Sequence, residues 1–266
     1  MTGTSNSPKS GGSVQSIERM FEVLELITDA GGDVSLVELT GATELPRPTI
    51  HRILRTLIKL GYARQLPSRR YALGPRLIRI GAGANRQFGA LARPQLEQLV
   101  EDLGESVNMA ILDVDLIVYV AHVSSQHSMR MFTEVGRRAS LHNTGAGKAI
   151  LAQLPDDTVR SIIGRTGMAA LTEHSITDLD DLLAELERIR ARGYAIDEQE
   201  QEIGVRCYAM AVPNAPTPTA VSVSGPVSRV DGEFGERAVP FLRRATRSIA
   251  DESGAGAVAD SGAGIR

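Results

Sequence analysis

The sequence of 266 residues contains no tryptophan, one cysteine and three lysines, and only 4% of its residues are aromatic. The single cysteine, Cys207, excludes an internal disulfide, and a cytoplasmic setting is the default expectation. No window is apolar over a length that could span a bilayer. Both ends, residues 1–13 and 253–266, are rich in small residues and are expected to be disordered tails, the first of them without the apolar core of a signal peptide.

Acidic residues are absent from one continuous fifth of the chain. Residues 45–96 contain eleven Arg or Lys side chains and no Asp or Glu, although the whole chain carries a net charge of −3. A solvated basic surface normally mixes both signs of charge. The asymmetry therefore favours a polyanionic partner, and nucleic acid is the first candidate.

The same basic region lies in a pattern typical of a DNA-binding domain. Apolar spacing, a capping box at Ser35 and Glu38, prolines at 46 and 48 and a glycine at 61 delimit the elements. They predict a helix, a short helix, a turn, a third helix and a hairpin, over residues 14–28, 36–40, 42–45, 46–60 and 62–73. This order is that of a winged helix-turn-helix, which we place at residues 14–75.

The third helix would supply the residues that read DNA. In a helix-turn-helix, the N-terminal part of the second helix of the motif enters the major groove. Its apolar stripe leaves five polar side chains on or beside the other face: Arg47, Thr49, His51, Arg52 and Arg55. Arg47, Thr49 and Arg52 are best placed to reach base edges, and Arg55 to reach phosphate; His51 is read as a surface or interface residue. Arg69 and Arg70, at the hairpin tip, are expected to contact the DNA backbone.

The rest of the chain predicts a helix that links two domains and then an α+β domain. Residues 76–92 form the linker helix, and residues 93–252 alternate helices with strands that pair through short turns. Helices are predicted over 94–103, 144–154, 157–163, 178–192 and 234–251, and strands over 107–112, 116–123, 194–197, 205–212 and 219–224. The fold class is therefore α+β with a mainly antiparallel sheet.

No motif in this second domain supports catalysis or a cofactor. Gly145-Ala-Gly-Lys148 lacks the remaining residues of a phosphate-binding loop, and His122 and His127 lack a third metal ligand. No Ser/His/Asp set is evident. We therefore expect no metal, no cofactor and no enzyme. Two alternatives stay open: an enzyme acting on a small acid with a DNA-binding appendage, and an architectural DNA-binding protein without a ligand.

A polar cluster in the second domain has the composition of a small-anion pocket. Thr144-Gly-Ala-Gly147 begins a predicted helix, whose free N–H groups favour a carboxylate. Ser222 and Ser224 share one face of a strand, and Cys207 begins the strand that pairs with it. Each serine alone is explained by ordinary strand polarity, so only the combination favours a ligand.

Several motifs together resemble the IclR family of bacterial transcriptional regulators, in order, from about Val14 to Asp251. They are Ser16-Ile-Glu-Arg19, Leu45-Pro-Arg-Pro-Thr-Ile-His-Arg52, Leu60-Gly-Tyr62, Tyr71-Ala-Leu-Gly-Pro-Arg76, Leu141-His-Asn-Thr-Gly-Ala-Gly-Lys-Ala149, Arg192-Gly-Tyr194, Asp197-Glu198, Gly204-Val-Arg-Cys207 and Ser222-Val-Ser-Gly-Pro226. The resemblance implies a winged helix-turn-helix, a linker helix and an effector-binding domain. It also implies homodimers, often paired into tetramers, that bind palindromic operators, in many cases as repressors.

The motifs of the second domain look most like the branch that responds to glyoxylate and related small keto acids such as pyruvate. In that branch the acid lies against positions that match Gly145, Ala146, Asp197, Cys207, Ser222 and Ser224 here. The segment between Cys207 and Ser222 is slightly shorter than in the glyoxylate responder. In other branches aromatic acids occupy the same cavity, so an aromatic effector is the alternative.

Overall fold

The computed structural model describes residues 14–90 and 92–260, and the chain divides into two compact units with the boundary between Ala84 and Asn85. The tail expected at residues 1–13 lies outside the described residues. The boundary falls within helix α4 (Arg76–Phe88), which was predicted as the linker over 76–92. The helix ends four residues earlier than predicted, immediately before Gly89, which is a weak helix former.

The first two helices of the N-terminal unit contribute to one apolar core. Helix α1 (Gln15–Asp29) buries Val23, Leu24 and Ile27, and α2 (Leu36–Ala42) buries Leu39. The predicted capping box is present at the start of α2: the Ser35 N–H donates to Glu38 Oε2 at 2.6 Å, and the Glu38 N–H donates to Ser35 Oγ at 3.2 Å. The two bonds satisfy N–H groups that a helix start leaves free.

Helix α3 (Arg47–Leu60) runs across the same core, as the sequence predicts. Ile50, Leu54 and Leu57 are buried at the spacing of one helix face. The helix ends at Gly61, whose φ of 80° lies in the left-handed region that glycine adopts without strain. The opposite face of α3, which carries the basic residues, is thereby left to solvent.

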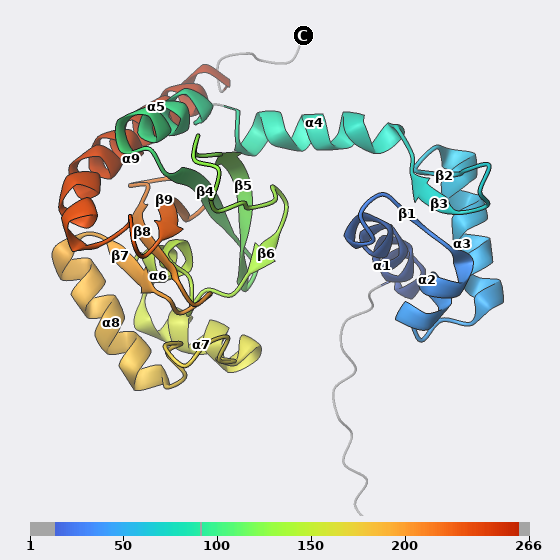
Figure 1. Ribbon diagram of the computed structural model, residues 1–266, viewed down its shortest axis with the longest axis horizontal. Helices are drawn as coiled ribbons and strands as arrows, with labels where there is room; N and C mark the ends of the chain where they lie inside the picture. The colour runs from blue at the N-terminus through green and yellow to red at the C-terminus, as the bar shows by residue number, and fades with distance from the viewer. Residues whose placement is uncertain (1–13, 91, 261–266) are drawn as a thin grey trace, which may run out of the picture. The chain divides into compact units, whose positions relative to one another are not determined.

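A three-stranded sheet completes the unit (Figure 1). The predicted hairpin consists of β2 (Ala63–Gln65) and β3 (Tyr71–Leu73), which pair antiparallel. A strand that was not predicted, β1 (Asp33–Val34), pairs with the other edge of β3. Two residues are too few to show alternation of apolar and polar side chains, so β1 gave no periodic signal.

The C-terminal unit contains a six-stranded sheet in which every neighbouring pair is antiparallel, in the order β6-β5-β4-β9-β8-β7. The strands are β4 (Ser106–Asp113), β5 (Leu116–Val123), β6 (Arg138–Ala139), β7 (Ala195–Glu198), β8 (Val205–Ala211) and β9 (Thr219–Pro226). Two predicted hairpins, β4–β5 and β8–β9, are joined at the centre by the pairing of β4 with β9. The short strand β6 was not predicted.

Helices cover both faces of this sheet (Figure 1). On one face, α5 (Arg93–Leu103) and α9 (Gly232–Asp260) pack on Val107, Val221 and Val223. On the other, α6 (Gly145–Leu151), α7 (Asp156–Thr166) and α8 (Leu179–Arg192) pack on Ala110, Ala209 and other small residues. No helix among residues 14–90 and 92–260 is long and apolar enough to cross a membrane.

The end of α9 corrects the expectation of a disordered tail from residue 253. The helix was predicted to end at Asp251 but continues to Asp260. Ala255, Ala257 and Ala259 lie in this extension, and alanine has the highest helix propensity, which offsets the cost of the glycines between them. Residues 261–266 lie outside the described part of the chain.

The start of α9 depends on a close approach that only glycine allows. A Cβ built on Gly235 would overlap the ring of Tyr208 on β8, whereas a Cβ on Gly232 would meet nothing within 4 Å. We expect Gly235→Ala to lower the free energy of unfolding by about 1–3 kcal/mol, a typical cost of overpacking. The control is Gly232→Ala, which should leave the denaturation midpoint unchanged. Equal midpoints for the two variants would show that α9 can move away from β8 at no cost.

Candidate functional site

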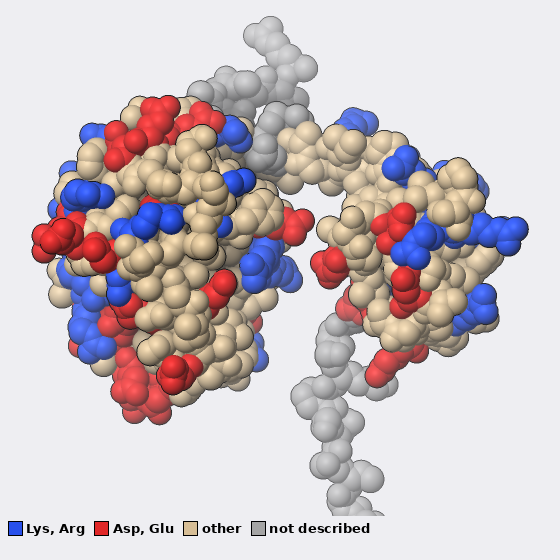
Figure 2. All heavy atoms as spheres, viewed as in Figure 1, with Lys and Arg blue, Asp and Glu red and all other residues tan. Residues whose placement is uncertain are grey.

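Two places in the described chain gather functional side chains: the exposed face of α3 and a cavity in the C-terminal unit. On α3, Arg47, His51, Arg55 and Lys59 follow one another at intervals of four residues, so they share one side of the helix. All four are exposed, and none has an ion-pair partner in the described part of the chain. In Figure 2, basic side chains gather on the α3 side of the N-terminal unit, whereas acidic ones gather over α1 and α2.

The other residues predicted to read bases lie on a different side of α3. Thr49, Arg52 and Thr56 line a groove of about 330 Å³ between α3 and α1, together with Ser16 and Arg19. Arg47 and Arg52 are five residues apart and therefore point in different directions from the helix axis. The predicted base-reading set is thus divided between an exposed stripe and a groove that holds two guanidinium groups.

The two arginines of the hairpin differ in their surroundings. Both Arg69 and Arg70 were expected at the tip, free to contact the DNA backbone. Arg69 is exposed in the turn, with a φ of 64°. Arg70 instead forms an ion pair with Asp33 of β1 and a second one with Glu38 of α2 at 3.0 Å. Its guanidinium therefore holds the hairpin against β1 and α2. The contact with Asp33 was not predicted because strand β1 was not predicted.

A small cavity lies between the sheet and the start of α6 in the C-terminal unit. Its volume is about 60 Å³. All six residues expected to contact an effector line it: Gly145, Ala146, Asp197, Cys207, Ser222 and Ser224. Thr144, from the predicted polar cluster, also lines it. Further lining residues were not predicted: Asn108, Tyr119, Met131, Phe132, Thr133, Arg137, Gln201, Glu202 and Val205.

Strand register explains how residues so distant in sequence form one floor. Across the sheet, Asp197 pairs with Cys207, and Cys207 pairs with Ser224. Asn108 on β4 lies opposite Ser222 on β9. Side chains of directly opposed residues point to the same face, so these five polar groups form a continuous patch. Asn108 was missed because the pairing of β4 with β9 leaves no local signal in the sequence.

The wall opposite this floor is the backbone of α6. A Cβ on Gly145 would lie 2.9 Å from Cys207 Sγ, which is closer than real Cβ atoms approach a neighbour. Thr144 caps the helix, and its Oγ1 accepts a hydrogen bond from the Gly147 N–H at 3.0 Å. The N–H groups of Gly145 and Ala146, in the first turn, have no acceptor within the helix. Main-chain donors therefore face the polar floor at short range.

A hydrogen-bonded chain extends the floor toward β5. His122 Nδ1 lies 2.7 Å from Asn108 Oδ1, and His122 Nε2 lies 2.9 Å from Ser124 Oγ. Burial and the nearby Arg130 guanidinium hold the pKa of His122 below its usual value. Both imidazole nitrogens are thus engaged, which disfavours a role as a metal ligand. Among the described residues, no group of three or more His, Cys, Asp or Glu side chains could hold a metal ion.

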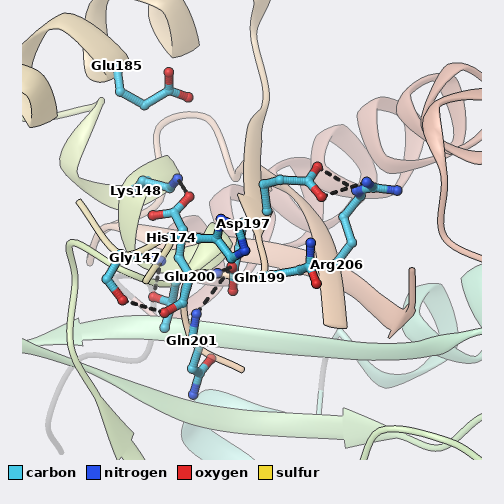
Figure 3. A network of polar contacts seen from close by, with 12 residues as sticks. Gly147, Lys148, His174, Glu185, Asp197, Gln199, Glu200, Gln201 and Arg206 are labelled. Carbon is cyan, nitrogen blue, oxygen red and sulfur yellow. Dashed lines mark hydrogen bonds and ion pairs between the residues drawn. The ribbon is translucent and has the colours of Figure 1, made fainter. Parts of the chain in front are cut away.

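Buried charges lie beside the cavity (Figure 3). Lys148 on α6 forms an ion pair with Glu200, and the two side chains are 1% and 6% exposed. Asp197 Oδ1 accepts hydrogen bonds from the backbone N–H groups of Glu200 at 2.7 Å and Gln201 at 3.4 Å. Burial, with the nearby Glu200 carboxylate, raises the pKa of Asp197 to about 7 in spite of these two bonds.

Cys207 is the sole cysteine and is fully enclosed on the floor. Burial strongly raises the pKa of its thiol, and the neighbouring Asp197 adds to the effect. A protonated thiol is a weak nucleophile but a hydrogen-bond donor. The cavity thus offers donors for a polar ligand, without an activated nucleophile.

The raised pKa of Asp197 predicts a pH-dependent stability. Because the folded state holds this proton more tightly than the unfolded chain does, the contribution is complete below about pH 4 and is lost as the pH rises to about 7. Asp197→Asn keeps the oxygen that accepts the two N–H bonds and removes the charge. We expect the variant to lose less stability than the wild type between pH 5 and pH 8, by several degrees in Tm. Parallel curves of Tm against pH, measured by calorimetry, would contradict the assignment.

Comparison with known proteins places both units in one family. The family model described as the IclR helix-turn-helix domain matches residues 16–67, and that described as the bacterial transcriptional regulator IclR C-terminal domain matches residues 84–251. The chain is similar to the transcriptional repressor IclR of Escherichia coli K12, with 34% identity over 246 residues, 88% of this chain and 90% of that protein.

Solved structures with the same fold were also found. A transcriptional regulator from Rhodococcus sp. RHA1 has 31% identity and a TM-score of 0.78, covering 91% of this chain and 99% of that one. An IclR homologue from Microbacterium hydrocarbonoxydans, complexed with 4-hydroxybenzoate, has a TM-score of 0.78 over 90% of this chain and 99% of that one; at 20% identity it shows the fold alone. The chain belongs to the IclR family of bacterial transcriptional regulators, and it is a DNA-binding regulator rather than an enzyme.

Proposed function

We propose that this regulator binds its operator with an affinity set by a two- or three-carbon keto acid, such as glyoxylate or pyruvate, and that it acts as a repressor in the cytoplasm. The observation that carries the proposal is the cavity: it is small, lined by polar groups, and contains all six residues at the positions matched to the keto-acid branch. The regulated genes follow from the operator, which a binding-site selection would identify.

The size of the cavity favours a small acid over an aromatic one. A volume of about 60 Å³ holds roughly four to six water-sized groups. Glyoxylate and pyruvate are of this size, whereas a benzoate ring with its carboxylate is larger. The Microbacterium homologue was solved with 4-hydroxybenzoate. For such a ligand, the segment around Phe132, which is 70% exposed, would have to move outward.

The chemistry of the lining suits a carboxylate with an adjacent carbonyl or hydrate. A small anion loses its hydration on entering a cavity, so several hydrogen-bond donors must replace the lost water. Hydrogen-bond donors lie on both sides of the cavity. The floor offers the hydroxyls of Ser222 and Ser224 and the Cys207 thiol, and the opposite wall offers the main-chain N–H groups of Gly145 and Ala146. Asn108 reaches Ser224 Oγ at 3.5 Å and can orient that hydroxyl.

The mechanism we infer is a shift between two arrangements of a homodimer that can pair into tetramers. A palindromic operator requires two reading heads at a fixed spacing. If the effector binds one arrangement more tightly, it changes the population of the spacing that matches the operator, and α4 is the element through which the change would pass. An effector with equal affinity for both arrangements would have no effect.

Arg52 and Arg69 should have different effects on DNA binding. We expect Arg52→Ala to weaken binding to the operator by about 1–3 kcal/mol and to change binding to random DNA much less, because Arg52 would contact base edges. Arg69→Ala should weaken both equally and reduce the slope of log K against log salt, because the turn would contact phosphate. Fluorescence anisotropy with labelled duplexes at several salt concentrations measures both effects. An equal loss for Arg52→Ala on both duplexes would make Arg52 a phosphate contact.

The effector site can be tested separately from DNA binding. At a hundredfold excess over its Kd, a bound acid adds about 2.7 kcal/mol of stability, which a thermal-shift assay detects. We expect a shift with glyoxylate or pyruvate, none with benzoate, and none with either keto acid in the Ser222→Ala/Ser224→Ala variant. Operator affinity of that variant without effector should be unchanged. A shift with benzoate alone would assign the regulator to the aromatic-acid responders, and a shift that persists in the variant would place the site elsewhere.

A further inference from the structure

The cavity that we propose as the acid-binding site is lined by more acidic than basic side chains. Two carboxyl groups line it, Asp197 on the floor and Glu202 at the exposed rim, and Arg137 is the one cation among the described lining residues. Arg137 and Glu202 are both exposed, so water screens their effect on a ligand. Asp197, at 3% exposure, is the charge that a bound anion would meet without such screening.

The groups behind the floor do not neutralise Asp197. Lys148 of α6 is the buried cation nearby, and it pairs with Glu200. Glu185 of α8 lies beyond Lys148, is bonded to Arg188 and Arg192, and does not face the cavity. On the remaining strands, Cys207 and Tyr119 have pKa values raised by burial, so neither carries a charge near neutral pH. The buried groups beside the cavity are therefore two carboxyl groups, those of Asp197 and Glu200, and one ammonium group, that of Lys148, before any ligand enters.

Adding a carboxylate to this cluster would leave two uncompensated negative charges in a buried site. One oxygen of Glu200, Oε2, is already buried without a hydrogen-bond partner in the described structure. Burying a further unpaired charge costs several kcal/mol, and proteins normally avoid the cost by changing the protonation state of a group. A proton bound to one carboxyl would turn the repulsion between Asp197 and an acid into a hydrogen bond.

The geometry leaves one oxygen of Asp197 for that proton. Both backbone hydrogen bonds, from Glu200 and Gln201, are accepted by Oδ1. Among the described residues, no donor is bonded to Oδ2, and Asp197 lines the cavity. We propose that the effector binds together with one proton, which Asp197 holds on Oδ2 and donates as a hydrogen bond to the carboxylate of the acid. The inference rests on the proposed function and names Asp197 as the residue that determines specificity.

Two consequences follow for the ligand. The pKa of Asp197, raised to about 7, means that the proton is present in part of the molecules before binding at neutral pH and is taken up by the rest on binding. One proton compensates one carboxylate, so the site selects monocarboxylates with a neutral carbonyl or hydroxyl group. A dicarboxylate of similar size, such as oxalate, would restore the repulsion and be rejected.

Isothermal titration calorimetry of the full-length protein with glyoxylate and pyruvate tests this directly. Titrations at each pH in two buffers that both titrate near that pH but differ in ionisation enthalpy give the number of protons taken up. We expect uptake near one proton per site at pH 8 and near zero at pH 5.5, with Kd rising up to tenfold per pH unit above pH 7. Oxalate should bind at least tenfold more weakly than glyoxylate at pH 7.

Two variants distinguish the role of Asp197 from a structural one. Asp197→Asn, a permanently neutral side chain of the same shape, should bind the keto acid with no proton uptake and a Kd that does not change between pH 6 and pH 8. Glu202→Gln, which removes the other lining carboxyl, should keep the uptake of the wild type. Binding by the wild type without proton uptake, or loss of binding in a folded Asp197→Asn, would overturn the inference while leaving the proposed function standing. Failure of both keto acids to bind at every pH would overturn both.

Discussion

The pairing of β4 with β9 is the contact on which the larger unit depends. It joins two hairpins, which end at Val123 and begin again at Val205, into one antiparallel sheet. The pleat of the joined strands then divides their side chains: Val107, Val221 and Val223 pack under α5 and α9, whereas Asn108, Ser222 and Ser224 face the cavity. A shift of one residue in this register would exchange the two sets, placing serines in the apolar core and valines in the site.

The same pairing marks the boundary of what the sequence could predict. Local patterns specified the helices well, because caps such as Ser35, Gly61 and Gly193 and the spacing of apolar residues act within a few positions. Five of the six expected effector residues belonged to a polar cluster of the sequence, motif resemblance added Asp197, and all six line one cavity. Asn108 was not predicted, because it joins the site only through a partner strand more than a hundred residues away. The ion pair of Arg70 with Asp33 was missed for a related reason, because it depends on β1, a strand of two residues.

Charge is distributed differently in the two units, in keeping with two kinds of anion. On α3 the basic residues stand in solvent, where phosphate can exchange counterions with them at little desolvation cost. In the C-terminal unit the buried cation beside the cavity, Lys148, is already paired. The small acid that we propose as effector would therefore be held mainly by neutral donors, which discriminate by shape and hydrogen-bond geometry rather than by net charge. Long-range electrostatic attraction therefore comes from the exposed basic residues of α3 and acts on DNA.

The closeness of α6 to β8 also limits how this regulator could be converted into a sensor for other compounds. Of the two α6 residues that line the cavity, Gly145 has no side chain and Ala146 has only a methyl group, so substitutions on α6 can create little space. Cys207 and Asp197 are held in sheet register, and shortening them would remove the polar floor itself. The segment of residues 131–133 is the adaptable wall, since it lines the cavity and Phe132, which is 70% exposed, can be exchanged without disturbing a core. A biosensor library built on this scaffold would vary that segment and leave α6 intact.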